Sequence, residues 1–131
     1  MYNELRDINE EIKRKQEYIE ELRSIATSMT MNLSERVQTS PEDRLSNLMC
    51  KIIMAETELN AMIDEYSDLK LRTRMEIFTL PNEEWQDILC MHYIEFKSFA
   101  EIAEIKNITI NAVKKRNQRA LKTLKYLRNK T

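Results

Sequence analysis

The chain has 131 residues, 42% of them apolar and 33% charged, with a formal net charge of −1. This balance argues against a disordered chain, and no segment approaches the ~20 consecutive apolar residues that a membrane span requires. Glycine is absent and there are 2 prolines, so the sequence makes little provision for tight turns. The composition therefore disfavours a sheet protein and predicts an all-α fold that is not embedded in a membrane.

The charges are divided unevenly along the chain. No acidic residue follows Glu104, whereas nine basic residues lie between Lys106 and Lys130. The part before Lys106 contains 12 basic and 22 acidic side chains. Lysines near a helix C-terminus favour the helix macrodipole, but this accounts only for the last turn of a helix. The division predicts a basic end that meets a polyanion and an acidic end with another role.

The residues at the start of the sequence and the two cysteines indicate a reducing compartment. Residues 1–7 have neither the basic cluster nor the apolar stretch of a signal peptide, so we expect a cytoplasmic protein. Cys50 and Cys90 lie far apart, each within an apolar helical pattern. We expect two reduced, buried thiols rather than a disulfide or a metal site.

The first predicted element is a long helix from about Asn3 to Met31. Its apolar side chains recur at spacings of three and four, with Lys15 filling the one gap, which is the rhythm of a coiled-coil seam. These side chains are Leu5, Ile8, Ile12, Ile19, Leu22, Ala26 and Met29.

A connection and a second long helix follow. Residues 32–39 have no sustained period and are rich in residues that suit turns. Ser40 is then the predicted N-cap, with Pro41 at the first helical position. From Leu45 to Leu69 the apolar spacing of the first helix is repeated.

The simplest arrangement of the two long helices is an antiparallel hairpin formed by residues 1–79. Met49, Ile53 and Ile63 extend the apolar face of the second helix beyond a two-helix seam. This surplus surface needs a partner, which could be a second copy of the chain, the C-terminal domain or another protein. We therefore expect a dimerisation or partner-binding hairpin, with a homodimer through the N-terminal helices as one outcome.

A domain boundary is predicted near residue 80. Pro81 disfavours helix at Leu80, and Asn82 is suited to cap the helix that follows. Residues 80–131 are expected to form a separate domain of three helices. These helices begin near Glu83, Ser98 and Thr109, and the first of them is predicted to reach Tyr93.

The junction between the second and third of these helices has the pattern of a helix-turn-helix. Ala103 is small enough to let two helices cross closely, and Asn107 stands where the turn needs a left-handed backbone. Ile108 fills the turn, Thr109 caps the next helix, and Val113 returns to the core. Residue type and spacing together predict a helix-turn-helix.

These residues belong to a longer pattern that resembles region 4 of sigma-70-type transcription factors, over roughly residues 80–125. Phe96 and Asn107 depart from it, since both stand where glycine is common. With long helices ahead of this domain, the chain looks like the RinA/ArpU-type regulators of Gram-positive phages. The matching segments are Leu80-Pro81, Ile88-Leu89, His92 to Glu95, Ser98 to Ala103, Thr109, Val113 and Arg119 to Leu124.

The resemblance implies that the third helix enters the major groove of double-stranded DNA at a promoter or operator. A helical projection places a core face on one side of that helix and a DNA face on the other. The core face comprises Val113, Asn117, Ala120 and Leu124. The predicted base-reading residues, whose amides suit adenine and whose ammonium groups suit guanine, are Asn111, Lys114, Lys115 and Gln118. The predicted phosphate contacts are Lys97, Ser98, Arg116, Arg119 and Lys122.

No pattern in the sequence indicates an enzyme, a cofactor or a metal site. There is no glycine-rich phosphate loop and no nucleophile–base pairing, and we interpret His92 as structural. Two functions remain open: a sequence-specific transcriptional regulator, phage-encoded and sigma-like or acting with RNA polymerase, or a structural adaptor such as a small terminase-like subunit for phage DNA packaging. A regulator is expected to prefer its site over random duplex by ~10³-fold or more.

Overall fold

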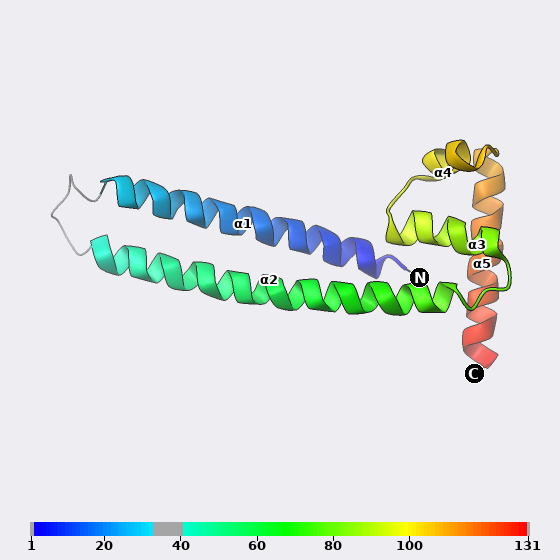
Figure 1. The fold of residues 1–131 in the computed structure, drawn as a ribbon, viewed down its shortest axis with the longest axis horizontal. Coiled ribbons are helices and arrows are strands. Elements are labelled where there is room, and N and C mark those ends of the chain that lie inside the picture. The colour runs from blue at the N-terminus through cyan, green and yellow to red at the C-terminus, as the bar shows by residue number, and fades with distance from the viewer. Residues whose placement is uncertain (1, 33–40, 131) are drawn as a thin grey trace. The chain divides into compact units, whose positions relative to one another are not determined.

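The computed structural model describes residues 2–32 and 41–130. Every regular element in this part of the chain is helical, which confirms the all-α fold with two long helices ahead of a helix-turn-helix region (Figure 1). The elements are α1 (Glu4–Asn32), α2 (Pro41–Ile77), α3 (Glu83–Leu89), the π-helical turn η1 (Cys90–Ile94), α4 (Phe99–Lys106) and α5 (Ile110–Lys130).

The chain divides into two compact units, which we call the hairpin unit and the helix-turn-helix unit. The hairpin unit is Ile8–Tyr66, and the helix-turn-helix unit combines Met1–Asp7 with Ser67–Thr131. The long helices α1 and α2 therefore contribute residues to both units. None of the helices in the described residues is long and apolar enough to cross a bilayer.

In the hairpin unit, α1 and α2 lie antiparallel and bury the seam that the sequence predicts (Figure 1). Pro41 begins α2 as expected, whereas the predicted connection from residue 33 and the predicted cap Ser40 lie outside the described residues. The buried seam residues are Ile12, Ile19, Leu22 and Ala26 of α1 and Ile52 and Ala55 of α2.

Two ion pairs link α1 to α2 beside the seam. Lys15 pairs with Glu58, and Arg23 pairs with Glu56. All four side chains remain at least a quarter exposed, and each such pair contributes only about 0–1 kcal/mol. The apolar seam therefore stabilises the hairpin more than the ion pairs do.

The surplus apolar face predicted for α2 is exposed in the hairpin unit. Met49, Ile53 and Ile63 are 45%, 58% and 38% exposed, respectively. Cys50 is also exposed, so the expectation of a buried thiol is wrong for this residue. It precedes the buried Ile52 by two residues, which places it about 200° around the helix from the seam. Both cysteines are free, and Cys90 is partly buried.

The helix-turn-helix unit includes the end of α2, from Ser67, ahead of the boundary predicted near residue 80. After α2 ends at Ile77, the side-chain oxygen of Asn82 accepts hydrogen bonds from the backbone amides of Glu84 (2.9 Å) and Trp85 (3.3 Å). The capped helix α3 is shorter than predicted, because its α-helical part ends at Leu89 rather than near Tyr93. The chain continues as η1, in which the amide of residue 95 donates to the carbonyl oxygen of residue 90 over 3.0 Å.

A small apolar core joins α3, α4 and α5. Ile88, Ile102 and Val113 have no exposed surface, and Ala103 is 5% exposed within the same cluster. Three partly buried apolar side chains pack around these four residues: Met91, Phe99 and Ile108. This arrangement confirms the core positions assigned to Ala103, Ile108 and Val113.

Enlarging Ala103 tests this core directly. Ala103→Leu inserts three carbon atoms into a closely packed crossing, so we expect the free energy of unfolding to fall by about 1–3 kcal/mol. Ala100→Leu, on the exposed surface of α4, is the matched control and should change stability by less than about 0.5 kcal/mol. Chemical denaturation followed by circular dichroism measures both, and equal stability of the two variants would contradict the close crossing.

Candidate nucleic-acid interface

The first helix of the helix-turn-helix motif, α4, has its N-terminus fixed by Ser98. The backbone of Ser98 is extended, and its hydroxyl oxygen accepts a hydrogen bond from the amide of Glu101 over 3.1 Å. Before it, Phe96 has a φ of 62°, the conformation that glycine favours at such a turn. The cap and the left-handed residue together direct the chain from η1 into α4.

The turn between α4 and α5 depends on Asn107. Its φ of 57° and ψ of 45° lie in the left-handed region, which asparagine tolerates better than most residues. The amide of Ile108 then donates to the carbonyl oxygen of Ala103 over 3.0 Å, which closes the end of α4. The next helix is capped by Thr109, whose hydroxyl oxygen accepts from the amide of Ala112 over 3.1 Å.

The buried face of α5 comprises the four residues that the projection predicts, Val113, Asn117, Ala120 and Leu124. The side-chain amide of Asn117 donates to the hydroxyl oxygen of Tyr93 over 3.3 Å. The other amide atom, Oδ1, is buried and accepts no hydrogen bond from the described residues. This contact between α5 and η1 gives the buried polar residue a partner that the sequence alone did not reveal.

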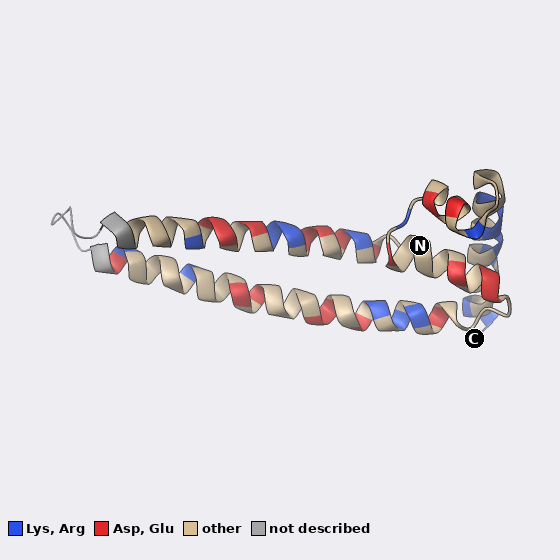
Figure 2. Ribbon diagram, turned by 45° about the horizontal axis from the view of Figure 1, so that its top comes forward, with Lys and Arg blue, Asp and Glu red and all other residues tan. Residues whose placement is uncertain are grey.

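The opposite face of α5 is exposed and carries the predicted base-reading residues. Asn111, Lys114, Lys115 and Gln118 are all exposed. Figure 2 shows basic residues along α5 and no acidic residue on it. The structure therefore brings these four side chains onto one polar and cationic surface.

The predicted phosphate contacts fall into two groups. Arg119 and Lys122 are exposed on α5. The other three already have partners within the unit: Ser98 caps α4, Lys97 lies 3.7 Å from a carboxylate oxygen of Glu95, and Arg116 forms an ion pair with Glu84 of α3.

Carboxylates on α3 pair with two cations of the helix-turn-helix motif, one on α4 and one on α5. Beside the pair of Arg116 with Glu84, Lys106 at the end of α4 lies 2.8 Å from Asp87. Both pairs are partly exposed, and such pairs are weak in water. They connect α3 to α4 and α5 without covering the exposed face of α5.

Part of the helix-turn-helix unit matches a known family. Residues 82–124 match the family model described as sigma-70, region 4. The resemblance predicted from the sequence is thereby confirmed for this part of the chain, which is a DNA-binding helix-turn-helix. No curated protein and no solved structure matches the chain.

The loop between η1 and α4 of this region 4 motif is held by His92. Its ring stacks on that of Phe99, with centroids 4.1 Å apart and planes inclined at 16°. Its Nδ1 also lies 2.7 Å from the carbonyl oxygen of Lys97. These contacts support the structural interpretation of His92. Across the described residues, no three His, Cys, Asp or Glu side chains form a candidate metal site.

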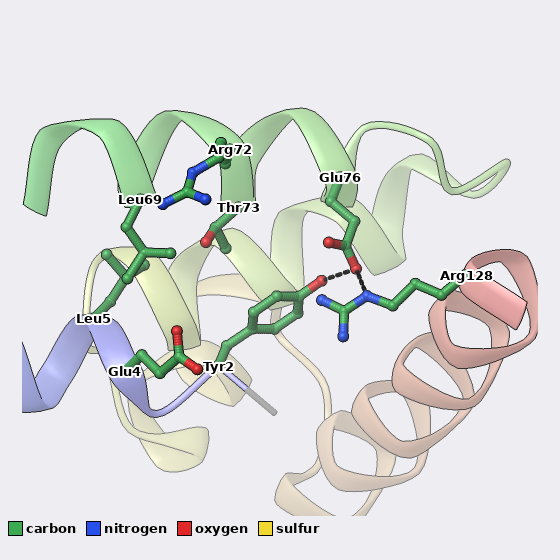
Figure 3. A pocket seen from close by; sticks show the side chains of 8 residues that line it. All are labelled: Tyr2, Glu4, Leu5, Leu69, Arg72, Thr73, Glu76 and Arg128. Atoms are coloured by element: carbon green, nitrogen blue, oxygen red, sulfur yellow. Dashed lines mark hydrogen bonds and ion pairs between the residues drawn. The ribbon is translucent and has the colours of Figure 1, made fainter. Parts of the chain in front are cut away.

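A polar cluster that sequence reasoning missed joins distant segments of the helix-turn-helix unit. The Tyr2 hydroxyl donates to Glu76 Oε1 of α2 over 2.7 Å, and Arg128 Nε donates to the same oxygen (Figure 3). The Arg128 guanidinium also lies 5.5 Å from the Tyr2 ring centroid. The cluster could not be predicted from the sequence, because residues 2, 76 and 128 are far apart in the chain and belong to no common sequence pattern.

The cluster shifts the ionisation of its members in opposite directions. Burial and the hydrogen bond to Glu76 raise the pKa of Tyr2. Burial also acts to raise the pKa of Glu76, but the hydrogen bonds from Arg128 and Tyr2 outweigh it and lower this pKa overall. At neutral pH, Glu76 is therefore an ionised acceptor between a neutral phenol and a guanidinium.

The lowered pKa of Glu76 predicts an acid-sensitive contribution to folding. A carboxylate whose pKa is depressed in the folded state stabilises the fold above its unfolded pKa of about 4.3, and this contribution is lost as pH falls through the folded value. We expect the stability of Glu76→Gln to fall less steeply below pH ~4 than that of the native protein. Urea denaturation at a series of pH values measures the difference.

A second variant separates the two hydrogen bonds to Glu76. Tyr2→Phe removes the phenol donor and keeps Arg128, so its acid dependence should lie between those of the native protein and Glu76→Gln. If the free energy of unfolding decreases equally with falling pH in all three proteins, Glu76 is excluded as a source of acid sensitivity.

Proposed function

We propose that the protein is a sequence-specific transcriptional regulator that binds double-stranded DNA through α5. The observation that carries this proposal is the division of α5 into two faces. One face is buried against α3 and α4, and the other is exposed, rich in basic residues and free of acidic ones. In a domain that matches sigma-70 region 4, such a face is the surface that meets DNA.

The leading turns of α5 supply the groups for base recognition. Asn111 and Gln118 are suited to pair with adenine through their side-chain amides, whereas Lys114 and Lys115 are suited to donate to guanine. All four are exposed, so a base edge reaches them without rearrangement of the core. Their position near the start of the helix fits the way recognition helices enter the major groove.

Phosphate contacts would then fix the position of α5 on the duplex. Arg119 and Lys122 are exposed for this role, and the exposed Ser98 lies at the N-terminus of α4, where backbone amides favour an anion. Lys97 and Arg116 would exchange Glu95 and Glu84 for phosphate oxygens. This exchange replaces weak, solvent-screened ion pairs, so its cost is small.

The hairpin unit is proposed to serve as the partner-binding arm of a phage-encoded regulator of the RinA/ArpU type. Its exposed apolar side chains on α2 suit either a second copy of the chain or RNA polymerase. Sigma-70 region 4 domains bind DNA and interact with RNA polymerase, which favours a regulator that acts at promoters. We place this regulator in the cytoplasm, where its DNA target lies.

Selection of bound DNA from a random pool tests the proposed function. A regulator should enrich one sequence and bind it ~10³-fold or more tightly than random duplex. A DNA-packaging adaptor, the second candidate, would bind duplexes without such enrichment. Size-exclusion chromatography with light scattering on the same preparation determines whether a dimer is the binding species.

Salt dependence tests the phosphate contacts. Arg119→Ala and Lys122→Ala should each reduce the slope of log K against log salt concentration by about 0.9, because each removes one phosphate neutralisation. The reduction should be equal on the selected site and on random duplex, since phosphates carry no sequence information. Lys13→Ala, on the exposed surface of α1, is the control, and slopes unchanged in all three variants would remove Arg119 and Lys122 from the interface.

A separate substitution tests base recognition. Asn111→Ala should relax the preference for adenine at one position of the selected site, with a loss of discrimination of about 1–3 kcal/mol. Repeating the selection with the variant measures this change. Asn129→Ala, at the exposed far end of α5, provides the control with the same chemistry. If both variants select the native sequence, Asn111 does not read a base.

A further inference from the structure

The first residue of α5, Ile110, has no role in the core or among the predicted DNA contacts. Ile110 is 45% exposed, although a branched apolar side chain gains by burial. By contrast, Val113 three residues later has no exposed surface. Ile110 therefore lies at the edge of the core, on the side that turns toward the exposed face of α5.

The position of Ile110 on the helix places it beside the predicted base-reading residues. A spacing of four residues puts it about 40° around the helix from Lys114, on the flank between the base-reading residues and the buried face to which Asn117 belongs. Side chains four residues apart are neighbours on a helix surface. Isolated apolar side chains are ordinary on protein surfaces, but this one lies in the turn of the helix that would enter the groove first.

The floor of the major groove offers one apolar group, the C5 methyl of thymine, among polar donors and acceptors. A buried contact between an isoleucine and a polar base edge would leave donors or acceptors without partners. A contact with the thymine methyl carries no such cost. An apolar residue at this position is therefore expected to contact thymine rather than another base.

We propose that Ile110 is a specificity-determining residue that contacts a thymine methyl group in the bound DNA site. This inference rests on the proposed function, since it requires α5 to lie in the major groove. It adds a residue that discriminates thymine from cytosine by an apolar contact. The predicted readers Asn111, Lys114, Lys115 and Gln118 act by hydrogen bonds instead.

The test removes the methyl group from the DNA rather than from the protein. In the sequence selected by the native protein, each thymine is replaced in turn by deoxyuridine, which keeps the base pair and lacks the methyl group. At one position, uracil should weaken binding by the native protein about fourfold, the value of one buried methyl-sized group. Fluorescence anisotropy with each duplex measures the dissociation constants.

Protein variants assign the effect to Ile110. In Ile110→Ala the uracil effect at that position should disappear, and in Ile110→Val it should be intermediate. Ile105→Ala, which truncates another exposed isoleucine on α4, should keep the full effect. Thermal melting of each variant verifies that it is folded, and the native protein with uracil duplexes gives the main result without any substitution.

The outcomes separate this inference from the proposed function. Loss of the uracil effect in Ile110→Ala alone supports the contact. An enriched sequence with no uracil effect, or with an effect that persists in Ile110→Ala, overturns the role of Ile110 and leaves the regulator intact. Absence of any enriched sequence overturns the proposed function and the role of Ile110 together.

Discussion

The close crossing of α4 and α5 is the constraint on which the proposed DNA-binding surface depends. Ala103 lets the two helices approach, and the left-handed backbone of Asn107 reverses the chain between them. With the buried face of α5 held in this way, its polar face must point outward. The same packing therefore sets both the stability of the unit and the direction of the exposed polar side chains of α5.

The charges of the helix-turn-helix unit follow from this arrangement. Acidic residues on α3 pair with Arg116 and Lys106, and the exposed face of α5 holds only basic and neutral side chains. The negative charge is thus kept on elements other than α5. A polyanion that approaches the exposed face of this helix meets a positive potential, although the whole chain has a net charge of only −1.

Local chemistry explains what could be predicted from the sequence. Caps at Asn82, Ser98 and Thr109, and the left-handed turn at Asn107, each depend on a few adjacent residues, so they could be recognised without a structure. The buried face of α5 followed from helical period alone. Cys50 shows the limit of this reasoning, because apolar neighbours along a helix do not establish that a residue faces the seam.

Contacts between distant segments explain what could not be predicted. The pair of Arg116 with Glu84 and the hydrogen bond of Asn117 to Tyr93 depend on how the helices cross, which no short pattern records. The sequence pattern also did not show that α3 ends at Leu89 and continues as the π-helical turn η1. The base and phosphate contacts assigned to the exposed side chains remain predictions, because they concern a ligand rather than the fold.

The place of Tyr2 in the cluster with Glu76 and Arg128 has a consequence for biosynthesis. Ribosomes deliver a polypeptide in order, so the partners of Tyr2 emerge at widely separated times, and Arg128 comes last. The hairpin unit, by contrast, draws on one continuous stretch, Ile8–Tyr66. A nascent chain is therefore able to complete the hairpin unit before Arg128, which the cluster of the helix-turn-helix unit requires, has been synthesised.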